Sequence, residues 1–240
     1  MTTKLMYQDD AYLRTSSCKV LAHTGQGGVV LDASLFYATG GGQPGDGGSL
    51  SWDTGTCVIS TAIKGDEGAI VLMPAEDQSL PSVGVEVTQE LDWARRYGYM
   101  RVHTALHLLS VVVPLPVSGG SIGAEKGRLD FNMPEAPADM VALQAQLQAL
   151  IDLDLPVTEE WITEAELDAN PQLVKTMSVS PPRGAGRVRL VRIGSGDAQV
   201  DLQPCGGTHV KRTGEIGKIR IGKVEKKGKL NRRVYLHLDD

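Results

Sequence analysis

Two short segments, about a hundred residues apart in a chain of 240, constrain the fold more than any other feature. The first is His103-Thr-Ala-Leu-His107, whose i, i+4 spacing on a helix points both imidazoles the same way. The second is Cys205-Gly-Gly-Thr-His209, in which two glycines let the backbone curl around a bound ion. Three histidines and one cysteine favour tetrahedral zinc. We therefore predict that His103, His107, Cys205 and His209 bind Zn²⁺, the alternative being two core histidines and a buried thiol.

The residues around these ligands disfavour two classes of zinc enzyme. Metalloproteases of the H-E-x-x-H type need a glutamate directly after the first histidine, and Thr104 stands there. Zinc deaminases place a glutamate two residues after the ligand histidine and continue with P-C-x-x-C. In this chain Ala105 occupies the first position, and Pro204-Cys205 is followed by Gly-Gly-Thr-His. Neither proteolysis nor deamination is therefore expected.

Charge is distributed unevenly along the chain. The formal net charge is −5 and the pI about 5.6, which disfavours a generic polyanion binder. Residues 1–90 hold 4 Lys and Arg against 11 Asp and Glu, whereas residues 211–233 hold 10 against 2. Taken alone, the basic segment predicts either a solvated strand face or a surface that binds phosphates.

Three cysteines, an odd number, indicate a reducing compartment rather than a disulfide framework. Cys18 and Cys57 lie in strand-like contexts and are expected in the core. The first ten residues lack an apolar signal region, and no stretch is apolar enough to cross a bilayer. We expect a cytoplasmic protein with no membrane contact, and the sequence leaves its oligomeric state open.

Residues 1–90 read as short β-strands punctuated by glycine, which predicts a small barrel or sandwich. A glycine cluster over residues 40–48 lacks the Lys-Ser/Thr of a P-loop and fits turn chemistry. Within it, Gln43 and Asp46 are candidate substrate contacts, because glycine backbone can approach a ligand closely. The strands are expected at residues 18–22, 28–32, 34–37, 56–60, 69–73 and 83–87.

The pattern changes near residue 90, where we place a domain boundary between residues 1–90 and 91–240. Helices are expected at residues 91–113 and 137–151, and residues 118–123 read as a turn. The second domain should combine helices with a largely antiparallel sheet, so the chain is assigned to the α+β class. Its strands are expected near residues 128–132, 155–162, 187–193, 198–202, 216–224 and 232–238.

Five segments carry a family resemblance: residues 95–109 and 201–210 with the ligand motifs, 213–219, the basic run 225–235, and the glycine-rich 36–48. They resemble the editing domain of alanyl-tRNA synthetases, and above all its free-standing relatives, the AlaX trans-editing proteins. The resemblance implies a glycine-rich β-barrel followed by a zinc-containing α/β editing domain. It also implies hydrolysis of the aminoacyl ester on tRNA-Ala mischarged with serine or glycine.

The resemblance extends to individual residues. It implies that His103, His107, Cys205 and His209 hold the zinc ion. The catalytic candidates are His103, His107 and Thr104, whose hydroxyl can be donated into the pocket. Thr104 can equally be satisfied by its own helix backbone. Asp201 can orient a ligand histidine or merely end a strand. The residues expected to contact substrate or the tRNA acceptor stem are Gln43, Asp46, Ser118, Ser121, Arg95, Arg96, Arg101, Lys226, Lys227, Arg232 and Arg233.

Three functions remain open at this point, and the first of them, a zinc-dependent tRNA deacylase, has two possible mechanisms. Zinc can activate a water molecule if one coordination position is free, or it can organise the pocket if four protein ligands close the site. A non-catalytic, zinc-stabilised RNA-binding module is the principal alternative to an enzyme. A small-ester hydrolase that acts without tRNA is a third reading.

Overall fold

The computed structural model describes residues 2–177 and 186–239, and the chain divides into two compact units, Met1–Tyr97 and Gly98–Asp240. The predicted boundary near residue 90 falls within the last strand of the first unit. Both units combine antiparallel strands with few helices, and the predicted α+β class is confirmed. No helix in the described ranges is long and apolar enough to cross a membrane.

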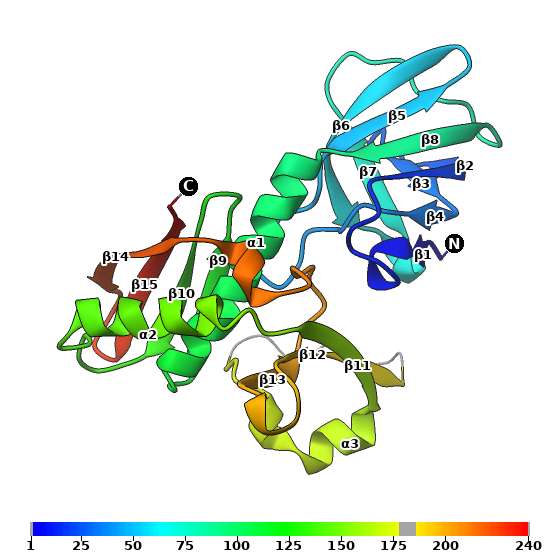
Figure 1. Ribbon diagram of the computed structural model, residues 1–240. Helices are drawn as coiled ribbons and strands as arrows, with labels where there is room; N and C mark the ends of the chain where they lie inside the picture. Colours follow the sequence, from blue (N-terminus) through cyan, green and yellow to red (C-terminus); the bar gives the residue numbers. More distant parts are fainter. Residues whose placement is uncertain (1, 178–185, 240) are drawn as a thin grey trace. The chain divides into compact units, whose positions relative to one another are not determined.

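The first unit is built around a closed antiparallel barrel (Figure 1). Strand β8 shows why the sequence forms it: side chains of Glu86–Leu91 alternate strictly between exposed and buried. A short parallel pair, β1 (Lys4–Leu5) and β4 (Ala33–Ser34), lies outside the barrel sheet. The barrel strands, in their order around it, are β2 (Thr15–His23), β3 (Val29–Leu31), β7 (Ile70–Pro74), β6 (Gly55–Lys64), β5 (Gly48–Trp52) and β8.

The barrel interior is a continuous apolar core that includes Leu31, Phe36, Leu50 and Leu72, all with 0% exposure. Cys18 and Cys57 are buried and unpaired by disulfides, which confirms them as core residues. Burial raises the pKa of the Cys18 thiol to about 12, so it stays protonated and chemically quiet.

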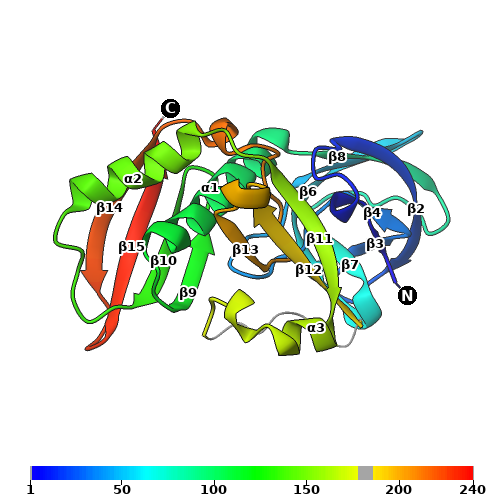
Figure 2. The same ribbon diagram turned by 60° about the horizontal axis from the view of Figure 1, so that its bottom comes forward.

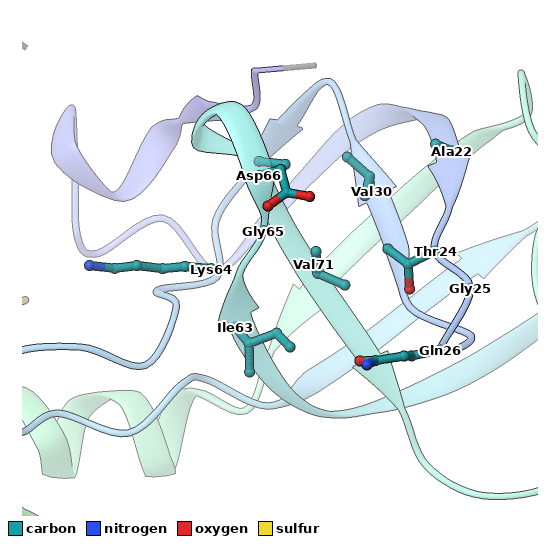
Figure 3. Close-up of a pocket in the computed structure, with 11 residues that line it drawn as sticks. Ala22, Thr24, Gly25, Gln26, Val30, Ile63, Lys64, Gly65, Asp66 and Val71 are labelled. Carbon is teal, nitrogen blue, oxygen red and sulfur yellow. The ribbon is translucent and has the colours of Figure 1, made fainter.

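A shallow hollow lies on the outer side of strands β3 and β7 (Figure 3). Its floor consists of Val30, Ile63 and Val71, which lie between the β2–β3 turn and the β6–β7 turn. Among the described residues that line it, only Lys64 and Asp66 are charged. The apolar side chains packed around Val30 bury the outer face of β3. Within the described parts of the chain, the residues that line the hollow include no cluster of catalytic side chains.

Helix α1 (Trp93–Val112) confirms the predicted helix over residues 91–113. The Asp92 side chain accepts a hydrogen bond from the Arg95 backbone N–H at 3.2 Å, which caps the first turn. Pro114 follows Val113 and cannot continue the helix. A Cβ placed on Gly127 would lie 2.6 Å from Val102 Cγ1, so the glycine lets the helix lie close against the sheet.

In the second unit this helix packs on a four-stranded antiparallel sheet, ordered β14, β15, β10, β9 (Figure 2). Helix α2 (Met140–Asp152) lies along the outer strand, where Gln144 and Gln148 accept hydrogen bonds from the backbone N–H groups of Ile221 and Ile219. These side chains satisfy an edge that would otherwise stay unpaired. The strands are β9 (Val117–Ile122), β10 (Lys126–Asn132), β14 (Ile219–Lys226) and β15 (Asn231–Leu238).

A separate three-stranded antiparallel sheet contains β11 (Val157–Thr163), β12 (Arg187–Ile193) and β13 (Asp201–Pro204). Helix α3 (Glu164–Ala169) follows β11 directly. Thr163 and Glu166 form a capping box at its start, a short helix signal that the sequence analysis did not include. Five 3-10 turns occur among the described residues, at Met6–Gln8, Asp66–Gly68, Pro171–Leu173, Gly196–Ala198 and Thr213–Ile216.

The prediction of a turn over residues 118–123 is wrong. Residues Val117–Ile122 form strand β9, which pairs with β10 from Gly127↔Ile122 to Phe131↔Val117. Glycine suits the close packing here, since a Cβ on Gly120 would lie 3.1 Å from Leu129 Cδ2. Tertiary pairing therefore outweighs the turn preference of the Ser-Gly-Gly-Ser run.

Candidate metal centre

The structure brings the two ligand motifs together. Helix α1 places His103 and His107 one turn apart, and the loop after β13 places Cys205 and His209 beside them. One ligand atom from each residue lies within 4.8 Å of all the others. The three imidazoles are only 5–7% exposed, whereas Cys205 is partly exposed. These four residues can hold a metal ion.

The distances around the thiol fit a tetrahedral ion. Cys205 Sγ lies 3.5 Å from His103 Nε2 and 3.3 Å from His209 Nε2. In a tetrahedral site with Zn–N near 2.0 Å and Zn–S near 2.3 Å, ligand atoms are roughly 3.3–3.5 Å apart. The Cys205 sulfur and the nitrogens of His103 and His209 thus lie at about the spacing that zinc requires, and all four ligand atoms lie within 4.8 Å of one another.

The carboxylate of Asp201 holds the first of the ligand rings. His107 Nδ1 donates to Asp201 Oδ2 at 3.0 Å, and the Gln203 side-chain amide donates to the same oxygen at 2.8 Å. Burial alone would lower the pKa of His107, but hydrogen bonds to Asp201 and Cys205 raise it to about 9. A metal ion must therefore displace a proton from this ring, and Nε2 is the nitrogen left for it.

Thr104 holds the second ligand ring. Its hydroxyl donates to the Met100 carbonyl at 2.9 Å, so towards His209 Nδ1, 3.1 Å away, it can only accept. His209 must then carry its proton on Nδ1, which turns the Nε2 lone pair towards Cys205. Burial, with the nearby charge of His103, lowers the pKa of His209 to about 3, so the ring is neutral. Thr104 is fully buried and acts on His209 rather than facing a solvent-filled pocket.

Replacing Thr104 with valine should weaken zinc binding by roughly tenfold, the lower end of the range for outer ligand contacts. The change keeps the shape of the side chain but leaves the buried His209 Nδ1–H without an acceptor. Competition with a chromophoric chelator measures the affinity, and Thr104→Ser, which keeps the hydroxyl, serves as the control. Unchanged zinc affinity together with lost ester hydrolysis would instead make Thr104 a substrate-contacting residue.

The loop that carries Cys205 is anchored by a buried arginine. Arg189 Nη1 donates to the carbonyls of Cys205 and Gly207 at 2.8 and 2.9 Å, and its Nε donates to Glu159 Oε2 at 2.9 Å. The Gly207 N–H in turn points at the Cys205 sulfur, 3.4 Å away. Burial opposes ionisation of Cys205, yet the charge of His103, with hydrogen bonds from His103 and His107, holds its pKa well below the usual range. The thiol is thus prepared as the thiolate that binds metals.

Three of the predicted substrate contacts lie inside the barrel unit. Asp46 and Arg96 form an ion pair with both side chains at 0–1% exposure, and Arg96 also donates to the carbonyls of Ala11 and Leu35. Gln43 is 1% exposed beside the turn that it closes with Gly40. A solute cannot reach these groups in this structure, and their contacts stabilise the first unit.

The two serines predicted to contact substrate lie on strand β9. Ser118 donates to the carbonyl of Asp130 at 3.1 Å, so its hydroxyl is committed to the sheet, whereas Ser121 is exposed. Residues 119–123, Gly-Gly-Ser-Ile-Gly, have the G-x-S-x-G spacing of a nucleophile elbow. Ser121 lies within an edge strand rather than at a strand-to-helix turn, so the geometry of that elbow is absent there.

The predicted basic contacts fall into two groups. Four arginines already make hydrogen bonds or ion pairs with other residues of the chain: Arg95 with Asp92 and the Ser60 carbonyl, Arg101 with the Ile216 carbonyl, Arg232 with the carbonyls of Gly228, Asn231 and Pro134, and Arg233 with Asp130. Lys227 pairs with Glu225 at 2.8 Å. Lys226 and Lys229 are exposed on the β14–β15 hairpin and are the cations best placed there to meet a phosphate.

Four residues whose contacts lead to the ligands or to Asp201 are not among the predicted ones: Glu159, Lys175, Arg189 and Gln203. Arg189 interrupts an apolar strand at a position where side chains are buried, which is a signal that could have identified it. Gln203 lies two residues after Asp201 on the same short strand, so the alternation of side chains places both on the buried face. Lys175 lies in an irregular segment and gives no such signal.

Two family descriptions match the chain. Residues 188–235 match the threonyl and alanyl tRNA synthetase second additional domain, and residues 10–95 match the class II (A) tRNA synthetases. The first description covers the loop of Cys205 and His209, and the second covers most of the barrel unit. The matched regions thus lie in both units.

Individual relatives cover nearly the whole chain. The alanyl-tRNA editing protein AlaX-M of Methanosarcina acetivorans is 31% identical over 99% of this chain and 100% of its own length. AlaX-M of Saccharolobus solfataricus is 32% identical over 97% and 98%. An alanine–tRNA ligase of Pyrobaculum calidifontis is 34% identical over 93% of this chain, which spans only 25% of the ligase. Full-length similarity at this level shows that the chain belongs to the family of AlaX alanyl-tRNA editing proteins.

Proposed function

We propose that the protein is a zinc-dependent hydrolase that removes serine or glycine from mischarged tRNA-Ala. The observation that carries the proposal is the buried group of three histidines and one thiolate, in a chain similar over its whole length to AlaX-M proteins. An aminoacyl ester is already activated, so catalysis needs mainly correct placement of the ester and stabilisation of negative charge at its carbonyl oxygen. A bound zinc ion supplies positive charge for both tasks.

The residues of this chain prepare the site for that chemistry. Asp201 and Thr104 fix the nitrogens that His107 and His209 present, and Arg189 fixes the loop of Cys205. A Cβ on Gly206 would meet no atom within 4 Å, so the backbone beside the thiol borders open space. A small aminoacyl group can approach the centre on that side.

Multiple-turnover release of labelled amino acid from Ser-tRNA-Ala, Gly-tRNA-Ala and Ala-tRNA-Ala tests the proposal. We expect release of serine or glycine at sub-stoichiometric protein, with alanine retained. Equal hydrolysis of a seryl ester of a small alcohol would indicate an esterase that does not need tRNA. No release from any of the three tRNAs, in protein that holds zinc, would favour the non-catalytic RNA-binding module, for which four protein ligands are typical.

We expect the β14–β15 hairpin to contribute to tRNA binding through Lys226 and Lys229. Each phosphate contact of a lysine adds about 0.7–0.9 to the slope of log K against log salt. Replacing both lysines with glutamine should therefore lower the slope by roughly 1.5 and weaken binding without changing amino-acid preference. Filter binding over a salt series measures it, with Lys4→Gln/Lys64→Gln in the barrel unit as the control. An unchanged slope would place the RNA on another surface.

A further inference from the structure

Lys175 is the one described lysine whose ammonium group contacts a residue that supports a candidate metal ligand. Its Nζ lies 2.5 Å from Asp201 Oδ1 and 3.4 Å from Ser110 Oγ. Its backbone carbonyl accepts the N–H of Val117 at 3.0 Å, and Met177 N–H donates back to the Val117 carbonyl at 2.7 Å. Lys175 thus lies against the start of strand β9 while its side chain reaches the carboxylate behind His107.

Both oxygens of that carboxylate are occupied. Oδ1 accepts from Lys175, and Oδ2 accepts from His107 Nδ1 and from the Gln203 amide. The Asp201 side chain is 0% exposed, whereas that of Lys175 is 28% exposed. A buried carboxylate without a counter-charge is costly, so the ammonium group keeps Asp201 ionised and holds it in one orientation.

We propose that Lys175 is a positioning residue of the metal centre: through Asp201 it fixes the ring orientation and tautomer of His107, so that Nε2 faces the ion. This inference rests on the proposed zinc at the four-residue group. Outer contacts of this kind orient a ligand ring and raise its basicity, and their loss costs roughly 10–100-fold in metal affinity. Lys175 contacts Asp201 and not the ligand ring itself, and it belongs to a segment of the chain that contains neither ligand motif.

A simpler reading assigns Lys175 only the task of holding its own segment against β9. The backbone contacts with Val117 would serve that task with any side chain. The two readings differ in one respect: a residue that acts by pairing with the Asp201 carboxylate loses its effect once residue 201 carries no charge. A segment anchor has the same effect in either background.

A double-mutant cycle with Lys175→Met and Asp201→Asn separates the two readings. Zinc affinity is measured in the full-length protein by competition with a chromophoric chelator, and the visible absorption of the Co²⁺-loaded protein reports ligand geometry. Lys175→Arg keeps the positive charge and tests for rescue. Lys218→Met is the matched control, since Lys218 forms an exposed pair with Asp152 at 3.7 Å. Thermal melts of each metal-free variant confirm folding.

We expect Lys175→Met to weaken zinc binding about tenfold and to shift the Co²⁺ spectrum, and Lys175→Arg to restore both. In the Asp201→Asn background the same replacement should change affinity less than about twofold. Equal losses in both backgrounds, or no loss in either, would overturn the role of Lys175 while leaving the metal centre intact. Failure of the unaltered protein to bind zinc would overturn the proposed centre itself, a result that the direct binding measurement distinguishes.

Discussion

Replacing Cys205 with alanine should abolish both zinc binding and deacylation. The thiolate is the only sulfur in the four-residue group, and Cys205 also begins the loop that Arg189 anchors. Loss of a ligand should cost more than the roughly 10–100-fold that outer contacts cost. Metal content and multiple-turnover release of serine from Ser-tRNA-Ala measure the two effects on the same preparation.

The matched control for this experiment is Cys18→Ala, which removes a buried thiol from the barrel core. It should retain zinc and activity with a small loss of stability. Chelator-treated protein of natural sequence should lose deacylation and recover it on addition of Zn²⁺. Full turnover by the Cys205→Ala variant, or by protein shown to be free of metal, would contradict the proposed zinc-dependent mechanism.

Replacing Asp46 with alanine should lower the free energy of unfolding of the first unit by about 3–5 kcal/mol. The change leaves the Arg96 guanidinium, which is 0% exposed, without its counter-charge, and it removes the acceptor for the Tyr37 backbone N–H. Denaturant unfolding followed by tryptophan fluorescence measures the loss, because Trp52 and Trp93 both lie in this unit.

The neighbouring arginine supplies the control. Arg95 forms an ion pair with Asp92 in which both side chains are about 40% exposed, at 40% and 41%. Exposed pairs of this kind contribute about 0–1 kcal/mol, so Arg95→Ala should change stability little. If Arg95→Ala and Asp46→Ala lowered the free energy of unfolding equally, burial of the Asp46–Arg96 pair would not account for its contribution to stability.

The comparison of Arg95 with Arg96 shows what sequence could and could not predict. Adjacent arginines at the start of a helix read alike in the sequence, and both were interpreted as RNA contacts. Their positions on the helix make them different. Arg96 faces the barrel core and pairs with the carboxylate of Asp46, 50 residues earlier in the chain. Only the folded chain reveals such a pair, since no spacing rule links the two residues.

The sequence predicted best those elements whose apolar periodicity is bounded by residues that start or stop a helix. The helix of His103 and His107, with Asp92 before it and Pro114 after it, was predicted within two residues at each end. Strand β9 was missed because its glycines suit a turn, and the pairing with β10 that makes it a strand joins residues that no local signal links. Lys175 and Glu159 were missed because their partners are distant in the sequence. Lys175 contacts Asp201, 26 positions away, and Glu159 contacts Arg189, 30 positions away.

The placement of the ligands has a consequence for how the second unit holds together. His103 and His107 belong to a helix that packs on the four-stranded sheet, whereas Cys205 follows the last strand of the three-stranded sheet. An ion bound by all four is therefore a crosslink between two sheets, closing a loop of 102 residues between His103 and Cys205. In chain-entropy terms a covalent closure of about 100 residues is worth about 4–5 kcal/mol against the unfolded chain. Loading with zinc should accordingly raise the unfolding temperature of Gly98–Asp240 and leave that of Met1–Tyr97 unchanged.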